Sequence, residues 1–172
     1  MMEAAVICLA LTLYHEARGE PVVGQIAVSQ VVLNRVKDDR YPNTVCGVVR
    51  QAQYSKINGK LLLKRCQFSW FCDGRSDRPK DVKAFKWSYK LSKRILAGEF
   101  SDLVHGATHY HSVKVNPKWR IQKKRVTKIG DHIFHRWMEN DGTKKGKGLH
   151  TQKGFSKKRT AQTVEHEEEA WS

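Results

Sequence analysis

The sequence predicts an α+β fold: a mainly helical domain with a small antiparallel β element after the helices. Apolar residues recur at helical spacing in three long stretches, within residues 2–16, 21–37 and 79–98. After residue 106, short runs of β-branched and aromatic residues take over. The chain has 172 residues, of which 40% are hydrophobic, so it can bury a core, which excludes wholesale disorder.

The first two helices are predicted from their periodicity and their breakers. Residues 2–16 carry an apolar face that Gly19 and Pro21 end. A second helix covers residues 21–37, where the apolar positions favour a helix over a strand, and it ends before Pro42.

The middle of the chain is less regular. Thr44 is placed to cap a short helix that ends near Gln51, and a polar stretch follows. Residues 67–71 suggest a short strand or an ordered loop. The third long helix is expected to start with Pro79 in its first turn and to stop at Gly98.

The β element is predicted in two segments, residues 107–115 and 121–134, which are interrupted by Asn116, Pro117 and Gly130. These residues favour short strands and loops that close one side of the helical core.

The charge distribution predicts one folded domain and a tail. The chain has 32 Lys and Arg against 17 Asp and Glu, a net charge of +15. Residues 139–172, expected to be a flexible charged tail, hold seven basic and six acidic side chains, which leaves +14 on the domain, residues 1–138. Such a charge indicates a polyanionic partner: nucleic acid, an anionic membrane face or an acidic cell envelope.

No transmembrane span is expected. The longest apolar run, residues 4–13, is ten residues long, half of the roughly 20 that a membrane-spanning helix needs. A signal peptide would have Lys or Arg before this run and a small-residue cleavage site after it, whereas Glu3 comes before it and no such site follows. We therefore expect synthesis without a cleaved signal peptide.

Glu16 is the residue best placed for chemistry. It follows Leu9 by seven residues and Leu13 by three, which puts its carboxyl on the apolar face at the end of the first helix. Burial and the helix dipole would both raise its pKa, as a general acid requires. The alternative is a solvent-facing Glu16 paired with Arg18. Glu20 is a possible second acid, outside the helix.

Several strings of residues occur in a common order over residues 10–136. They are YHEARGEP (14–21), GQ (24–25), VVLNRV (31–36), YPNTVCGVV (41–49), CQFSW (66–70), CDG (72–74), GATHY (106–110) and IG (129–130), with Pro117, Trp119, His132 and Phe134. Together they resemble the SleB-type cell-wall hydrolases, the spore cortex-lytic enzyme family. The absence of export signal and binding repeats favours a phage endolysin-like member.

The resemblance implies a lysozyme-like domain that cleaves the glycan strand of peptidoglycan, with Glu16 as the catalytic acid and no cofactor. Family members act as lytic transglycosylases, which cut between N-acetylmuramic acid and N-acetylglucosamine and leave a 1,6-anhydro end; muramidase hydrolysis is the alternative. Tyr14 and His15 depart from the family string, which commonly has smaller residues there.

Five further residues are predicted to bind substrate: Gln67, Ser69, Tyr110, Trp119 and Glu20. The side chains of Gln67 and Ser69 can hydrogen-bond the acetamido groups of sugars. Alternatively, they only hydrogen-bond backbone N–H and C=O groups within a tight loop. Tyr110 and Trp119 can stack on pyranose rings, although Trp119 fits the core equally well. The expected partners are peptidoglycan strands and anionic envelope polymers, bound by a monomer that acts at the bacterial wall.

Two rival functions are considered. The first is a metal-dependent peptidoglycan amidase, because five histidines could provide zinc ligands: His105, His109, His111, His132 and His135. The sequence contains no H-E-x-x-H motif on a helix to support a zinc site, so we expect no metal.

The second rival is a nucleic-acid-binding module, because Trp70, Phe71 and Trp87 lie among basic residues. The same positive charge would also suit a cell-wall lytic enzyme, because the polyanions of the wall and of lipopolysaccharide attract cations as nucleic acid does.

The four cysteines leave the redox state open. Cys66 and Cys72 either close a loop as a disulfide in an oxidising envelope or stay buried thiols in the cytosol. Cys8 and Cys46 are expected in the core.

Overall fold

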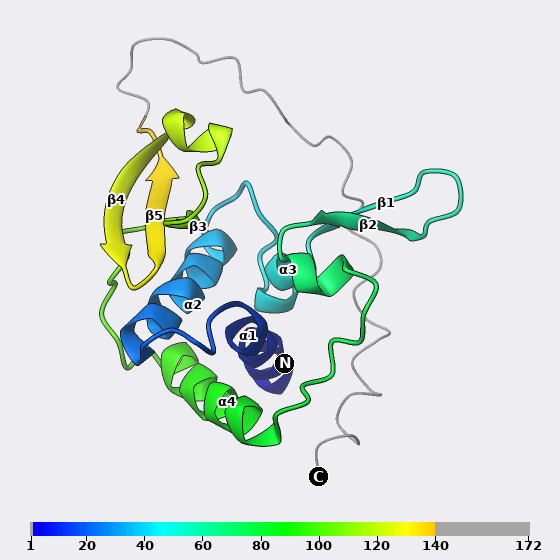
Figure 1. Ribbon diagram of the computed structural model, residues 1–172, viewed down its shortest axis with the longest axis horizontal. Coiled ribbons are helices and arrows are strands. Elements are labelled where there is room, and N and C mark those ends of the chain that lie inside the picture. Colours follow the sequence, from blue (N-terminus) through cyan, green and yellow to red (C-terminus); the bar gives the residue numbers. More distant parts are fainter. Residues whose placement is uncertain (1, 140–172) are drawn as a thin grey trace. The chain divides into compact units, whose positions relative to one another are not determined.

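A computed structural model describes residues 2–139, and the chain up to Trp137 forms one compact unit. Helices come first and a three-stranded sheet comes last (Figure 1), which confirms the predicted α+β class. The predicted tail lies outside the described residues except for Glu139.

The helices are α1 (Met2–Glu16), α2 (Val22–Val36), α3 (Val45–Val49) and α4 (Val82–Leu96), with 3-10 helices η1 (Ser69–Cys72) and η2 (Lys118–Gln122). The strands are β1 (Ala52–Tyr54), β2 (Leu61–Cys66), β3 (His109–Ser112), β4 (Lys123–Ile129) and β5 (His132–Trp137).

Helix α1 is the most enclosed element. Every residue from Val6 to Tyr14 is buried, because α2, α3 and α4 all pack against this helix. Its predicted bounds are confirmed, and α2 differs from its prediction by one residue at each end. Such continuous burial leaves α1 no solvent face along most of its length.

Helix α4 begins three residues later than predicted. Pro79 lies before the helix, and the Asp81 side chain accepts a hydrogen bond from Ala84 N at 2.9 Å, which caps the first turn. Just upstream, the Tyr14 hydroxyl accepts hydrogen bonds from the backbone N–H groups of Lys80 and Asp81. The end of α1 therefore fixes where α4 starts.

The C-terminal sheet is antiparallel, as predicted for the β element, and its strand order is β3-β5-β4. Tyr110 pairs with Phe134, and the Phe134 ring is completely buried. Because side chains alternate along a strand, Tyr110 and Phe134 share the core face, while His109, His111 and His135 lie on the other.

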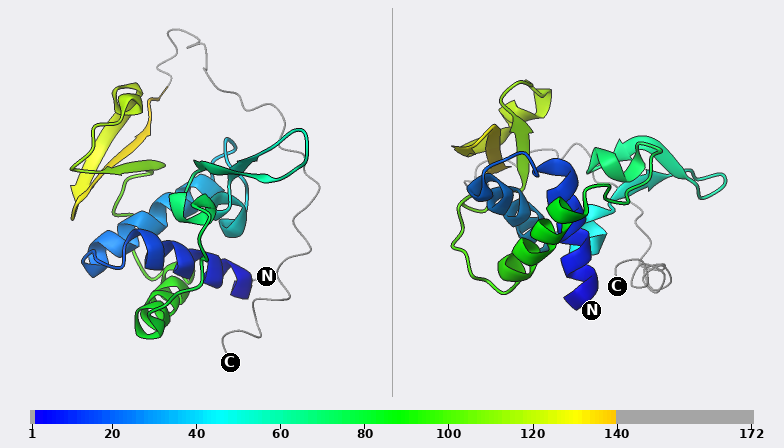
Figure 2. Two further views of the ribbon diagram at one scale, coloured as in Figure 1. Left: turned by 45° about the vertical axis from the view of Figure 1, so that its right-hand side comes forward. Right: turned by 60° about the horizontal axis from the view of Figure 1, so that its bottom comes forward.

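The hairpin of β1 and β2 was not predicted, and the strand or loop expected at residues 67–71 is partly the 3-10 helix η1, which buries Trp70. The hairpin extends away from the helices in all the views of Figures 1 and 2. Within residues 2–139, no helix is long and apolar enough to cross a bilayer.

All four cysteines form disulfides. Cys66 joins Cys72, one of the two states left open above. Cys8 joins Cys46 and so links α1 to α3, a pairing that the sequence did not predict. Cys8 is buried in the core as expected, and Cys46 is partly buried against it. Spacing alone did not indicate this pair, because it depends on how two helices pack.

Candidate active site

Glu16 ends α1 where the helix reaches the sheet. Its side chain is half-buried, and its Oε2 accepts a hydrogen bond of 3.0 Å from the Tyr110 hydroxyl of β3. Burial raises the pKa of Glu16 above its ordinary value of 4.5, while Tyr110, His15 and Arg35 oppose the rise without cancelling it. The carboxyl therefore keeps its proton to higher pH than an exposed glutamate and has partners that stabilise its charged form.

Tyr110 donates this hydrogen bond as a neutral phenol. Its ring packs against Phe134 and the edge of His132, on the core face of the sheet. Burial first, and Glu16 second, raise the pKa of Tyr110 well above its ordinary 10. The phenol stays protonated, so it can act as a fixed donor to the carboxylate.

Arg35 is a candidate site residue that was not among those predicted from the sequence. Its buried guanidinium donates from Nε to Thr108 O at 2.7 Å and from Nη1 to Gln67 Oε1 at 3.4 Å. The guanidinium also lies over the rings of Tyr41 and Phe68, with its carbon 5.4 and 5.7 Å from their centroids. Arg35 is the one charged residue of α2, and this was the feature that could have identified it.

Gln67 and Ser69 belong to the loop that the Cys66–Cys72 disulfide closes. Both side chains are exposed, and Arg35 orients the amide of Gln67. The Gln67 backbone N–H donates to Gln51 O at 2.9 Å. Arg35 thus connects the loop holding Gln67 to β3, the strand of Tyr110.

Glu20 lies at a different place from Glu16, against the turn between β4 and β5. Its Oε2 accepts a hydrogen bond from Asp131 N at 3.2 Å, and Oε1 is 3.7 Å from His132 Nδ1. Gly130 adopts a φ of 56°, and a Cβ there would overlap the Glu20 carboxylate. Glu20 therefore anchors the hairpin turn.

Trp119 lies on the opposite face of the sheet from the Glu16–Tyr110 pair. Its ring contacts His109, His111 and His135 at centroid distances of 5.3, 5.6 and 5.4 Å. The structure therefore does not bring Trp119 beside Glu16, and its contact with a sugar stays a prediction.

Four of the histidines considered for zinc lie on β3 and β5, and His105 lies in the turn before β3. His111 Nε2 lies 3.1 Å from His135 Nε2, His132 faces Glu20, and His105 is exposed. Over residues 2–139, no three His, Cys, Asp or Glu side chains converge in a group that could hold a metal ion.

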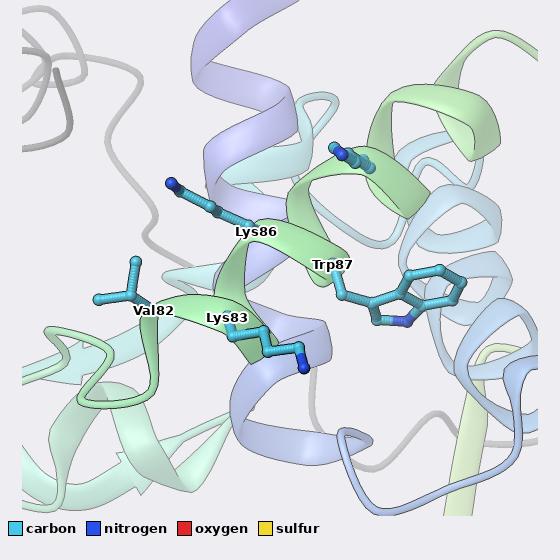
Figure 3. A pocket seen from close by; sticks show the side chains of 5 residues that line it. Val82, Lys83, Lys86 and Trp87 are labelled. Carbon is cyan, nitrogen blue, oxygen red and sulfur yellow. The ribbon is translucent and has the colours of Figure 1, made fainter.

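A surface hollow of about 590 Å³ lies on α4, lined by Val82, Lys83, Lys86, Trp87 and Lys90 (Figure 3). The Trp87 indole N–H donates to Gln25 Oε1 at 3.1 Å, so the ring is held in place. None of the predicted site residues lines this hollow.

A helical α+β domain whose first helix ends in a half-buried carboxyl, hydrogen-bonded by a tyrosine of the sheet, is an arrangement suited to acid–base chemistry. The chain belongs to the Cell Wall Hydrolase family, whose model matches residues 19–135. The predicted SleB-type family is thus confirmed. The match begins three residues after Glu16.

Curated relatives agree with this family. The spore cortex-lytic enzyme of Bacillus cereus is 29% identical over 129 residues, covering 73% of this chain and 42% of the relative. That of Halalkalibacterium halodurans is 31% identical over 127 residues, covering 73% of this chain and 33% of the relative. The chain thus spans less than half the length of these two relatives.

Solved structures agree as well. The catalytic domain of the germination-specific lytic transglycosylase SleB from Bacillus anthracis superposes with a TM-score of 0.57 at 28% identity, covering 77% of this chain and 93% of that domain. The SleB catalytic domain of Bacillus cereus gives a TM-score of 0.55 at 28% identity, covering 79% of this chain and 91% of the other.

Proposed function

We propose that this chain cleaves the glycan strand of bacterial peptidoglycan, with Glu16 acting first as general acid and then as general base. The observation that carries the proposal is the Glu16–Tyr110 hydrogen bond on a half-buried carboxyl whose pKa is raised. Membership of the Cell Wall Hydrolase family supports the choice of substrate.

In the first step, protonated Glu16 gives its proton to the glycosidic oxygen as the bond to the sugar C1 breaks. The carboxylate that forms accepts the hydrogen bond from Tyr110, and the positive charge of Arg35 favours the same ionised state. These two residues stabilise the charge that appears on the enzyme as the oxocarbenium-like centre forms on the substrate.

In the second step, the C6 hydroxyl of the same sugar attacks C1, and the Glu16 carboxylate takes its proton. This route needs one carboxyl, whereas ordinary glycoside hydrolysis uses two. The Glu20 carboxylate already accepts a hydrogen bond from the Asp131 backbone N–H, so it is not available as a second catalytic carboxyl, which favours the one-carboxyl route. The proposed product is therefore a 1,6-anhydro sugar, and the chain a lytic transglycosylase.

Substrate binding is proposed at the loop beside Arg35. Gln67 and Ser69 are exposed there, so their polar atoms can bind sugar acetamido groups. Tyr110 contacts the acid directly and would position the reacting sugar. The net charge of +15 supports attraction to anionic envelope polymers at the bacterial wall, where we propose the protein acts as a monomer.

Mass spectrometry of muropeptides released from purified sacculi tests this proposal. The wild-type protein should release products lighter by one water than hydrolysed muropeptides. Glu16→Gln should lower the release rate by about 10²–10⁴-fold, the usual contribution of a general acid.

Glu3→Gln is the matched control, because Glu3 begins the same helix and accepts a hydrogen bond from Tyr89, as Glu16 does from Tyr110. It should keep full activity. Retained activity in Glu16→Gln would reject the catalytic assignment, and hydrolysed products would reject the one-carboxyl route alone.

A further inference from the structure

The β1–β2 hairpin exposes an unusual amount of apolar surface. Ile57 at its tip is 97% exposed and Leu63 is 61% exposed, with Tyr54 and Leu62 also in solvent. The hairpin points away from the helices and from the three-stranded sheet (Figures 1 and 2). No other described element covers these side chains.

The turn that presents Ile57 is held by hydrogen bonds. Ser55 Oγ accepts from Ile57 N at 3.2 Å and from Asn58 N at 3.4 Å, and Gly59 N donates to Ser55 O at 2.9 Å. Gly59 closes the turn with a φ of 68°, which glycine adopts without strain. Ile57 is therefore held in solvent by an ordered turn.

A bulge exposes the two leucines. The ladder pairs Ala52 with Cys66 and Tyr54 with Leu61, so one residue of β1 faces four residues of β2, 62–65. The surplus residues leave the ladder, and their side chains lie in solvent. Because the Cys66–Cys72 disulfide fixes the end of β2, the bulge is a built feature of the hairpin.

The exposed apolar residues are surrounded by cations. Lys56, Lys60, Lys64 and Arg65 are all exposed, and residues 52–72 contain no acid. An aliphatic tip among basic side chains is complementary to a membrane with anionic headgroups, where cations bind phosphate and the apolar tip enters the acyl boundary.

We propose that the β1–β2 hairpin docks this protein on anionic lipid membranes, with Ile57 and Leu63 entering the boundary between headgroups and acyl chains. A glycan would be expected to meet aromatic and hydrogen-bonding groups, whereas the tip is aliphatic. A second copy of the chain would bring like charges together. The proposal does not depend on the cleavage reaction.

Co-sedimentation of the full chain with lipid vesicles tests the proposal. Binding should be strong on vesicles of phosphatidylglycerol and phosphatidylethanolamine and weak on phosphatidylcholine alone. Ile57→Ser should lower the partition coefficient about tenfold, the effect of losing one buried aliphatic side chain. Replacing both Lys56 and Lys60 by Gln should lower it by a similar factor at low salt and less at high salt.

Ile121→Ser is the matched control, because Ile121 is another isoleucine, 71% exposed on η2, and its loss should leave vesicle binding unchanged. In addition, an environment-sensitive dye on Ile57→Cys should shift to the blue with anionic vesicles, and the same dye on Ile121→Cys should not.

Equal vesicle binding by wild type and Ile57→Ser, or no dye shift at position 57, would overturn the proposal. So would loss of binding to isolated sacculi with vesicle binding intact, which would identify the hairpin as a glycan contact. Muropeptide release from membrane-free sacculi should be unchanged in Ile57→Ser, which separates this proposal from the cleavage activity.

Discussion

The balance of effects on Glu16 would suit a single carboxyl to the two opposite proton transfers proposed above. Burial favours the protonated form, whereas Tyr110, His15 and Arg35 favour the carboxylate. A carboxyl with only the first influence would give up its proton reluctantly, and one with only the second would be ionised before the substrate arrived. The two together leave the pKa of Glu16 raised, with partners that stabilise the carboxylate once it forms.

Tyr110→Phe tests the hydrogen bond directly. Because this bond lowers the pKa of Glu16, its loss should move the alkaline limb of the pH–rate profile to higher pH. The turnover rate should fall about tenfold, the effect of losing one hydrogen bond to a charged group. Tyr89→Phe removes a similar tyrosine–glutamate bond at the surface and should leave both quantities unchanged. An unshifted alkaline limb in Tyr110→Phe would contradict the assignment.

Glu16→Gln should also stabilise the fold in a defined pH range. The folded protein holds the Glu16 proton more tightly than the unfolded chain, whose carboxyl titrates near the ordinary 4.5. Wild type therefore loses free energy of unfolding as pH rises from about 4.5 to the raised pKa, and the neutral variant does not. Denaturant unfolding at several pH values should show the variant's advantage growing over that interval and constant above it. A constant difference at every pH would show that Glu16 is not perturbed.

Among the elements, α2 connects the two halves of the site. Arg35 near its end binds Thr108, which precedes β3, and Gln67, which follows β2. At the other end of α2, the Gln25 amide bonds Glu20 O and the Trp87 indole of α4. One helix thereby holds both the strand that carries Tyr110 and the loop that carries Gln67.

Arg35→Lys should weaken this connection while keeping the charge. A lysine ammonium cannot reproduce the two directions of the guanidinium, so the free energy of unfolding should fall by about 1–3 kcal/mol. The KM for glycan should rise, because Gln67 loses its partner. Arg94→Lys is the control, since the Arg94 and Glu99 side chains pair at the surface, where they are 55% and 44% exposed, and this change should cost less than about 1 kcal/mol. An Arg35→Lys protein as stable and as active as Arg94→Lys would remove Arg35 from the site.

For the whole molecule, the features predicted from sequence are those determined locally. The helices at residues 2–16 and 22–36 follow from periodicity and breakers, and Glu16 was identified because it ends the first of them. The missed features are contacts between distant segments. Arg35 acquires its partners 32 and 73 residues away, and the hairpin tip depends on the Ser55 turn.

The disulfides are the other long-range feature, and the chain's stability should depend on them unequally. Cys8–Cys46 spans 38 residues and Cys66–Cys72 spans six, so loop entropy predicts losses of about 4 and about 2 kcal/mol in the unfolding free energy when each pair is replaced by alanine. Denaturant unfolding of the two double variants, under oxidising conditions, measures this difference.

Only the Cys66–Cys72 variant should raise the KM for glycan, because that pair closes the loop of Gln67 and Ser69. Equal losses of stability, or a raised KM in the Cys8–Cys46 variant alone, would contradict these assignments. Neither disulfide is part of the Glu16–Tyr110 hydrogen bond. At a temperature low enough for both double variants to stay folded, the turnover rate should therefore be unchanged.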